Sequence, residues 1–183
     1  MRFAYYDNLS AARQRIYRKS DAIVTLGLPA GLALGGDVRA LGDALKADQR
    51  DGVQTVCQRM IDRLAAGYHV PKIRVRVLAR RLADGSGELH GLYEPEDGAT
   101  LARISVWMRT AQKKNVVAFK TFLRTLIHEL CHHLDYELFA LEETFHTEGF
   151  YKRESTLVAA LIEQMTALAA AGSAGDATTT RAD

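Results

Sequence analysis

Apolar residues recur at steps of three and four positions in the first third of the chain, which is the spacing of one face of an α-helix. A shorter stripe predicts a helix over residues 37–47. The clearest stripe predicts an amphipathic helix with Gly67 as its C-terminal stop. It consists of Val53, Val56, Cys57, Met60, Ile61 and Leu64. Residues 1–68 are therefore expected to form an N-terminal helical region.

The period of the pattern changes after residue 70. From Lys72 to Leu78, basic and apolar residues alternate strictly, which predicts a half-buried strand. Two further segments, residues 89–94 and 101–108, have strand character, and turn-forming residues separate the three segments. This order favours a small antiparallel sheet in which each strand pairs with the next.

Helical spacing returns in the last third of the chain. One stripe predicts a helix over residues 116–139, and a second predicts a last helix over about 152–170. Residues 172–183 contain no large apolar side chain and are expected to form a disordered tail. Helices, a sheet and then helices again indicate the α+β class. The expected organisation is the helical region, one domain over residues 69–171, and the tail.

The composition narrows the class of protein. The chain has 183 residues, of which 48% are hydrophobic and 25% charged, and these values suit one folded domain. Two cysteines are too few for a disulfide framework. The most apolar segment, residues 22–36, is shorter than the roughly 20 residues of a membrane span and contains Pro29. The first residues do not resemble a secretory signal. We therefore expect a cytoplasmic protein that does not enter the membrane.

A net charge of +2 is too small to indicate nucleic-acid binding by itself. One set of basic residues is nevertheless a candidate for contact with a phosphate backbone. No aromatic residues interleave it as a stacking surface would need, and a solvated strand face is the alternative interpretation. The set consists of Lys72, Arg74, Arg76, Arg80, Arg81, Lys113 and Lys114.

Residues 128–132 read His-Glu-Leu-Cys-His within the predicted helix 116–139. Two histidines four positions apart leave the same face of a helix one turn apart, so His128 and His132 can both reach one metal ion. Glu129 is displaced by about 100° around the helix. It is a poor third ligand, but it is well placed to contact a metal-bound water as a general base.

A catalytic zinc ion usually takes three protein ligands and keeps one position for water. His146 is the leading candidate for the third ligand, because the fourteen residues after His132 allow the helix to end and the chain to turn back. Glu154 is the alternative, since sites with two His and one Glu are also known. The sequence leaves both possibilities open.

Three more polar residues lie close to these candidates in the sequence. Asp135 falls on the same helix face as the two histidines and is positioned to accept a hydrogen bond from a ligand imidazole, although an ordinary surface role is equally consistent. Tyr151 and Arg153 follow the His146 segment and are candidates to stabilise an oxyanion. Core packing and surface charge are the simpler interpretations of these two side chains.

The motif His128-Glu-Leu-Cys-His132, followed by His146-Thr-Glu-Gly-Phe150, resembles the SprT-like (Spartan-type) zinc metallopeptidase domain. In that family a third histidine follows the helix after a loop and begins an element that places an aromatic residue four positions on. The resemblance covers about residues 70–165 and includes the predicted strands before the helix.

This resemblance implies a zincin-like fold with one Zn²⁺ ion held by His128, His132 and His146. It also implies hydrolysis of peptide bonds in a protein or peptide substrate by a zinc-activated water, with Glu129 as the general base. In such enzymes an edge strand beside the site pairs with the substrate backbone. The expected substrate strand consists of Ile104, Ser105, Val106, Trp107 and Met108.

Two alternatives belong to other functional classes. The first is a zinc-stabilised module that binds DNA or a protein without catalysis, and the presence of Glu129 argues against it. The second is a metal-dependent regulator whose N-terminal helices cover the site until they are released. The apolar segment 22–36 motivates this second alternative.

Overall fold

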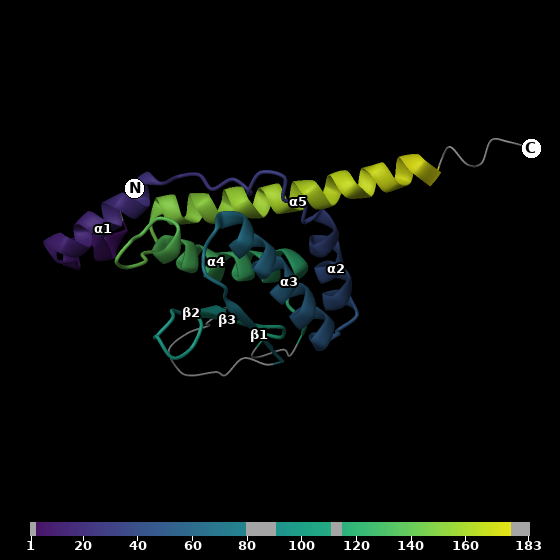
Figure 1. Cartoon of the computed structure of the whole chain (residues 1–183), viewed down its shortest axis with the longest axis horizontal. Helices are drawn as coiled ribbons and strands as arrows, with labels where there is room; N and C mark the ends of the chain where they lie inside the picture. The colour runs from purple at the N-terminus through teal and green to yellow at the C-terminus, as the bar shows by residue number, and fades with distance from the viewer. Residues whose placement is uncertain (1–2, 80–90, 111–114, 177–183) are drawn as a thin grey trace, which may run out of the picture.

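Helices cover one face of a small sheet in the computed structural model, which describes residues 3–79, 91–110 and 115–176 (Figure 1). This architecture confirms the α+β class. The long helix α5 lies on the outer side of the helical layer and extends past the rest of the molecule. A short 3-10 helix, Ala4–Asn8, precedes the five α-helices. These are α1 Ala11–Ala22, α2 Gly35–Lys46, α3 Arg50–Tyr68, α4 Phe119–Glu137 and α5 Glu148–Asp176.

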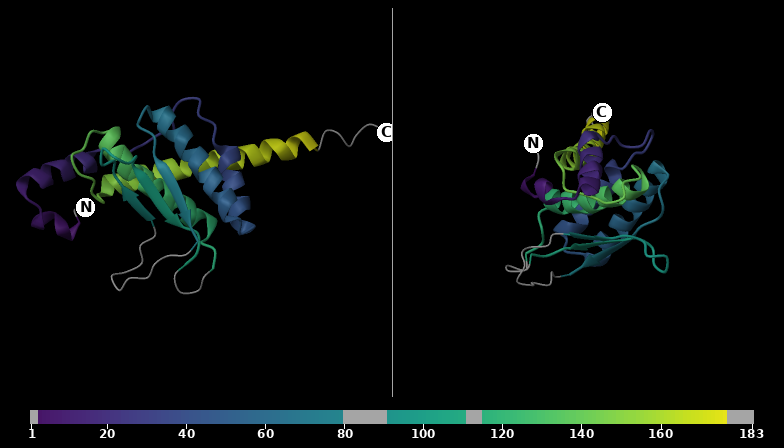
Figure 2. Two further views of the ribbon diagram at one scale, coloured as in Figure 1. Left: turned by 60° about the horizontal axis from the view of Figure 1, so that its bottom comes forward. Right: turned by 90° about the vertical axis from the view of Figure 1, so that its left-hand side faces the viewer.

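The described sheet is mixed, with the strand order β1-β3-β2. Its strands are β1 Arg74–Leu78, β2 Gly91–Glu94 and β3 Arg103–Trp107. β1 runs parallel to β3, and β2 runs antiparallel to β3. The prediction of an antiparallel meander is therefore wrong for β1. Turn-rich connections predict where strands end, but they do not determine which strands become neighbours in the sheet. Figure 2 shows the strands of the sheet side by side.

β3 is the central strand, and this corrects the prediction that Ile104 to Met108 form the edge strand that receives substrate. Ile104 lies between Val75 of β1 and Tyr93 of β2, so both sides of β3 are paired within the sheet. The N–H of Met108 donates to the carbonyl of Leu78, at 2.9 Å, which extends the pairing with β1 beyond the strand. The backbone of this strand is thus not available to another chain.

Two glutamine side chains from α3 close the outer edge of β1. The amide of Gln54 donates to the Val75 carbonyl at 2.9 Å and accepts from the Val77 N–H at 2.7 Å. Gln58 makes the same pair of bonds with the Ile73 carbonyl and the Val75 N–H, at 2.9 and 2.8 Å. Each amide replaces the peptide group of a missing strand, which protects the edge from pairing with other chains.

One hydrophobic core joins α2, α3, the sheet, α4 and α5. Residues on both sides of position 68 contribute to it, so the core continues across the expected domain boundary at 68. A second, smaller cluster joins the first residues of the chain to the segment between α4 and α5. Its buried members are Tyr6, Ile16, Tyr17, Leu141 and Phe145.

The ends of two helices differ from the sequence prediction. Gly67 lies inside α3 and does not end it. The close approach of Pro29, whose ring would lie 2.8 Å from an added Cβ, explains why this position is a glycine. The left-handed residue that ends the helix is His69, with φ 58°. α5 begins at Glu148, four residues earlier than expected, and continues to Asp176, so the first residues of the expected tail are helical. The remaining tail, 177–183, lies outside the described residues.

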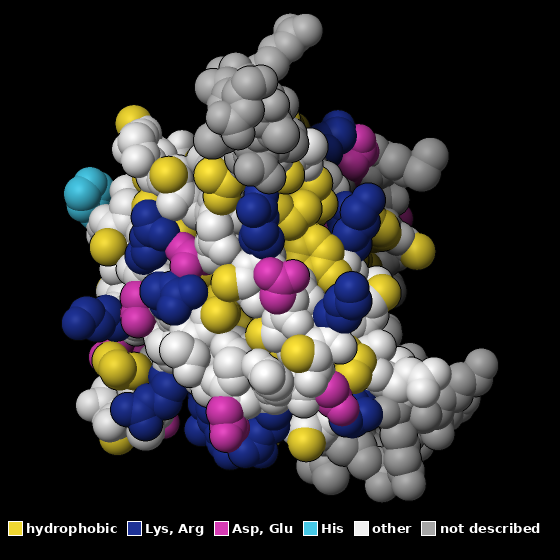
Figure 3. Space-filling view, turned by 90° about the vertical axis from the view of Figure 1, so that its right-hand side faces the viewer, with side chains coloured by type: hydrophobic (Ala, Val, Ile, Leu, Met, Phe, Trp, Pro, Cys, Tyr) yellow, Lys and Arg dark blue, Asp and Glu magenta, His cyan; other side chains and the backbone are white. Residues whose placement is uncertain are grey.

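The basic set predicted from the sequence is only partly described. Lys72, Arg74 and Arg76 are exposed, as the alternation of β1 requires. Arg80, Arg81, Lys113 and Lys114 lie outside the described residues, as do the turn at 83–87 and the first residues of the expected strand 89–94. At the end of the molecule shown in Figure 3, Lys and Arg side chains are interspersed with acidic and hydrophobic ones. Among the described helices, none is both long and apolar enough to cross a bilayer.

The closed edge of β1 generates a stability prediction. Replacing both glutamines, Gln54→Leu and Gln58→Leu, leaves the N–H groups of Val75 and Val77 without partners. We expect the free energy of unfolding in urea to fall by about 1–3 kcal/mol and the variant to aggregate more readily. Thr55→Leu, on the exposed face of the same helix, is the matched control. A double variant as stable as this control would show that the two amides do not stabilise the edge.

Candidate metal centre

The packing of α4 determines which of its side chains face the candidate site. Leu126, Ile127, Leu130 and Leu134 are fully buried against the core, as the amphipathic pattern requires. The positions on the opposite side include His128 and His132, which project from the helix one turn apart. His146 comes from the segment that follows α4 and turns back before α5. The structure therefore brings the three predicted histidines together.

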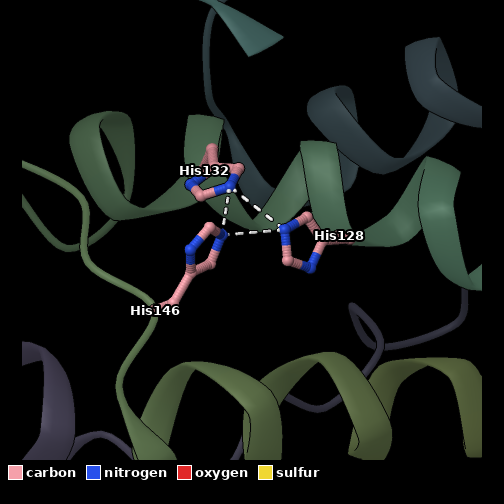
Figure 4. Close-up of side chains that lie close together, drawn as sticks. All are labelled: His128, His132 and His146. Carbon is pink, nitrogen blue, oxygen red and sulfur yellow. Dashed lines mark hydrogen bonds between the residues drawn. The ribbon is translucent and has the colours of Figure 1, made fainter. Parts of the chain in front are cut away.

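The three imidazole rings point toward a common centre through their Nε2 atoms (Figure 4). The Nε2 of His128 lies 3.0 Å from that of His146 and 3.3 Å from that of His132. The remaining pair, His132 and His146, is 3.2 Å apart. Tetrahedral zinc with Zn–N distances of 2.0–2.1 Å places its ligand nitrogens about 3.3–3.4 Å from one another. The observed triangle is within a few tenths of an ångström of that geometry.

The opposite ring nitrogens of two histidines are held by acceptors. The Nδ1 of His128 lies 2.8 Å from the carboxylate of Glu154, so it carries the proton that this bond requires. The Nδ1 of His132 lies 2.8 Å from the hydroxyl of Thr144. That hydroxyl donates its own proton to Asp135, at 2.9 Å, and therefore accepts from His132. Both rings consequently present an unprotonated Nε2 to the centre.

This arrangement of protons makes the trio suitable for a cation. A neutral imidazole carries one proton, so the Nε2 atoms of His128 and His132 cannot donate to each other. At most one proton, carried by His146, can lie among the three nitrogens. A metal ion would instead use all three lone pairs at once. In the described part of the chain, the ligand atoms of these three residues lie close enough to hold one ion.

Burial favours the neutral form of two of the rings. Burial lowers the pKa of His132 to about 3, and the neighbouring His128 and His146 add to this shift. Burial likewise lowers the pKa of His146. The neutral imidazole is the form that coordinates metals, so these two rings are prepared for coordination at physiological pH.

Glu129 is buried beside the trio and lies against β2. A Cβ added to Gly91 would approach the Oε1 of Glu129 to 2.3 Å, so only glycine fits opposite this carboxylate. The backbone N–H of Tyr93 hydrogen-bonds to the same carboxylate. Burial is the main reason that the pKa of Glu129 is raised to about 7.

The histidines and Glu129 line one cavity of about 720 Å³. Its walls come from β2, α4, the segment before α5 and the start of α5. None of its lining residues comes from the described part of the N-terminal helical region, so the described helices before β1 do not cover the site. The other lining residues are Leu92, Tyr93, Pro95, Thr121, Arg124, Thr125, Tyr136, Thr144, Tyr151 and Glu154, together with Gly91.

Glu154, the alternative third ligand, and Asp135, the expected hydrogen-bond partner of a ligand, both lie behind the histidines. Glu154 is buried behind His128, and its other oxygen accepts from Arg124 at 2.7 Å. It is thus a hydrogen-bond partner of a candidate ligand, and it lies outside the trio. Asp135 supports His132 as expected, but it does so through the hydroxyl of Thr144.

The two oxyanion candidates are separated by the fold. Arg153 is completely buried and donates to Asp135 and to the carbonyls of Ser20 and Ile23, at 2.6, 2.7 and 2.6 Å. It does not line the cavity, which corrects the prediction that it stabilises an oxyanion there. Tyr151 does line the cavity, and its ring stacks on His146 with centroids 5.8 Å apart.

Sequence reasoning missed several residues that shape the site. Gly91 lies inside a strand, and an isolated glycine there is a known sign of close approach by another group. Tyr93 donates or accepts at the Nδ1 of His133, at 3.0 Å, and stacks near His132. Thr144 precedes His146 by two residues, but nothing in its sequence context marks a hydroxyl that bridges a histidine and a carboxylate.

Comparisons with known proteins identify no relative of this chain. No protein-family model, no curated protein and no solved structure matches it. Any assignment of function must therefore come from the geometry of the candidate metal centre itself.

Proposed function

We propose that this chain is a zinc-dependent metallopeptidase related to the SprT-like family. The observation that carries the proposal is the convergence of three histidine Nε2 atoms in a cavity that also contains the carboxylate of Glu129. The chemistry of the donor set fits zinc, since three imidazoles are the ligands of a common type of catalytic zinc site. His128, His132 and His146 would hold the ion.

The proposed hydrolysis uses the metal ligands, the carboxylate of Glu129 and the side chains that orient them. Bound zinc lowers the pKa of water and polarises a carbonyl group. Glu129 is the general base that takes a proton from the attacking water and delivers it to the leaving amine. Gly91 leaves room for its carboxylate, and the N–H of Tyr93 hydrogen-bonds to it. Glu154 and Thr144 fix the orientation of two imidazoles, which maintains the direction of their lone pairs.

The two edges of the sheet support a peptide as the substrate. β1 is closed by Gln54 and Gln58, whereas β2 lines the cavity and pairs on one side only within the described ranges. An extended peptide could add to this edge through main-chain hydrogen bonds. We therefore place the substrate strand at β2, beside the zincin-like arrangement of helix and third histidine.

A non-catalytic zinc module is the competing function. Structural zinc sites usually have four protein ligands, whereas the described residues bring three together and leave the cavity beside them. Burying a carboxylate next to that cavity costs free energy, and groups with such a raised pKa cluster at functional sites. Both features favour catalysis, and the Glu129→Gln variant below separates the two functions.

Replacing the general base tests catalysis independently of metal binding. Glu129→Gln keeps the shape of the side chain but removes the proton acceptor, so we expect kcat/KM on a library of quenched fluorescent peptides to fall by at least about 10²-fold. Zinc content, measured by elemental analysis, should remain at one ion per chain. Glu137→Gln, at an exposed position of the same helix, is the control. Full activity of the Glu129 variant would eliminate it as the base.

Comparing His146 with Glu154 tests the ligand set. His146→Ala removes a ligand, and losing about one third of a binding free energy of roughly 12 kcal/mol weakens zinc binding by about 10³-fold. Glu154→Gln only neutralises the carboxylate that accepts from His128, and we expect a loss of about 10- to 100-fold. Competition with a zinc chelator measures both affinities. The reverse order of effects would place Glu154 among the ligands.

A further inference from the structure

The N-terminal arm is defined as residues 3–23, which contain the 3-10 helix and α1. We infer that the N-terminal arm positions His146 and His132, and that docking of the arm and binding of zinc stabilise each other. This inference rests on the proposed metal centre, but it adds an element that does not line the cavity.

The first contact joins the arm directly to the third histidine. The hydroxyl of Tyr5 donates to the backbone carbonyl of His146 at 2.9 Å. The ring of Tyr5 also packs near Tyr17, with centroids 5.9 Å apart, so the hydroxyl is held by its neighbours within the arm. Because this bond reaches the peptide group of His146, it restrains the position from which the imidazole projects.

The second contact fixes the beginning of α5, which follows His146. The side chain of Asp21 accepts from the N–H of Gly149 at 3.0 Å, and the hydroxyls of Ser20 and Thr147 are 3.4 Å apart. The backbones approach closely here, because a Cβ added to Gly149 would lie 2.4 Å from the carbonyl oxygen of Asp21. Glycine at 149 is therefore required for α1 to dock at this place.

The third contact reaches His132 through buried charges. Arg153 donates to the carbonyls of Ser20 and Ile23 at the end of α1, and the Ser20 carbonyl also accepts from the Ile23 N–H at 3.2 Å. The same guanidinium binds Asp135, which accepts from Thr144, the partner of the His132 ring. A continuous series of hydrogen bonds thus runs from the end of α1 to a candidate ligand.

Apolar packing supports the segment that connects the two ligands. Tyr17 and Ile16 of α1 are buried together with Leu141 and Phe145, which lie between His132 and His146 in the chain. Arg13 also pairs with Glu143 of this segment, with Nε and Oε2 2.8 Å apart. These contacts form a cluster separate from the main core.

These contacts imply coupling in both directions. Since the arm restrains two of three ligands, its displacement should weaken zinc binding. By thermodynamic reciprocity, zinc must then stabilise the docked arm by the same factor. Because the cluster that holds the arm is separate from the main core, the arm can loosen while the rest of the fold remains intact.

Three variants of the full chain test the positioning role. Tyr5→Phe removes only the hydroxyl, and we expect zinc affinity in chelator competition to fall about 3- to 10-fold. Gly149→Ala pushes α1 away from α5, and we expect a larger loss of about 10- to 100-fold. The control is Tyr68→Phe, because the Tyr68 hydroxyl makes an equivalent bond to the Gly27 carbonyl at 2.8 Å without touching the His146 segment.

Two further readouts separate positioning from general stability. The visible absorption of bound Co²⁺ reports the geometry of its ligands, and it should change in the Tyr5 and Gly149 variants but not in the Tyr68 control. Amide hydrogen exchange in α1 of the wild-type protein should slow when zinc is added, whereas exchange in α2 should not change.

The outcomes distinguish this inference from the proposed function. If the wild-type chain binds zinc, and the Tyr5→Phe and Gly149→Ala variants keep its zinc affinity and its Co²⁺ spectrum, the positioning role is overturned. The metallopeptidase proposal then still stands. If the wild-type chain binds no zinc, the proposed function fails and the inference fails with it.

Discussion

Two imidazoles present unprotonated nitrogens to one point, and a third ring meets them there; this convergence is the constraint on which the rest of the site depends. Its direction is determined at the opposite side of the rings, where Glu154 and Thr144 accept from the Nδ1 atoms of His128 and His132. Lone pairs facing one another at about 3 Å gain nothing unless a cation lies between them. The hydrogen bonds to the Nδ1 atoms therefore support the proposed metal centre.

The two edges of the sheet differ in how they lie relative to the same centre. Gln54 and Gln58 complete the hydrogen bonding of β1 on the side remote from the cavity. β2 lies on the other side of β3 and contributes Gly91 and Tyr93 to the cavity wall. Side-chain amides protect the edge at β1, and the carboxylate of Glu129 lies against β2. Under the proposed function, an extended chain would therefore add at β2 and not at β1.

What the sequence could predict was local. Helical periodicity placed His128 and His132 on one face, because the geometry of a helix is the same in every fold. The reach of the chain after α4 was sufficient to suggest His146. Helix ends were less predictable. Gly67 looked like a helix stop, but it lies inside α3, where Pro29 packs too closely for a side chain.

What the sequence could not predict depends on tertiary neighbours. The order of the strands is determined by packing on α3 and α4, so β3 was mistaken for an edge. Arg153 looked like a surface residue near the site, but it is buried because Asp135 and the carbonyl groups of α1 surround it. The support of His132 by Thr144 has no sequence signature either, because a hydroxyl acquires this role only when the loop before His146 folds back over α4.

X-ray absorption spectroscopy of the zinc-loaded chain tests the central claim most directly, because it identifies the atoms bound to the metal. The account predicts three imidazole nitrogens at about 2.0–2.1 Å and one further light atom from water. A zinc ion bound by fewer than three imidazoles, or by cysteine sulfur, would contradict it.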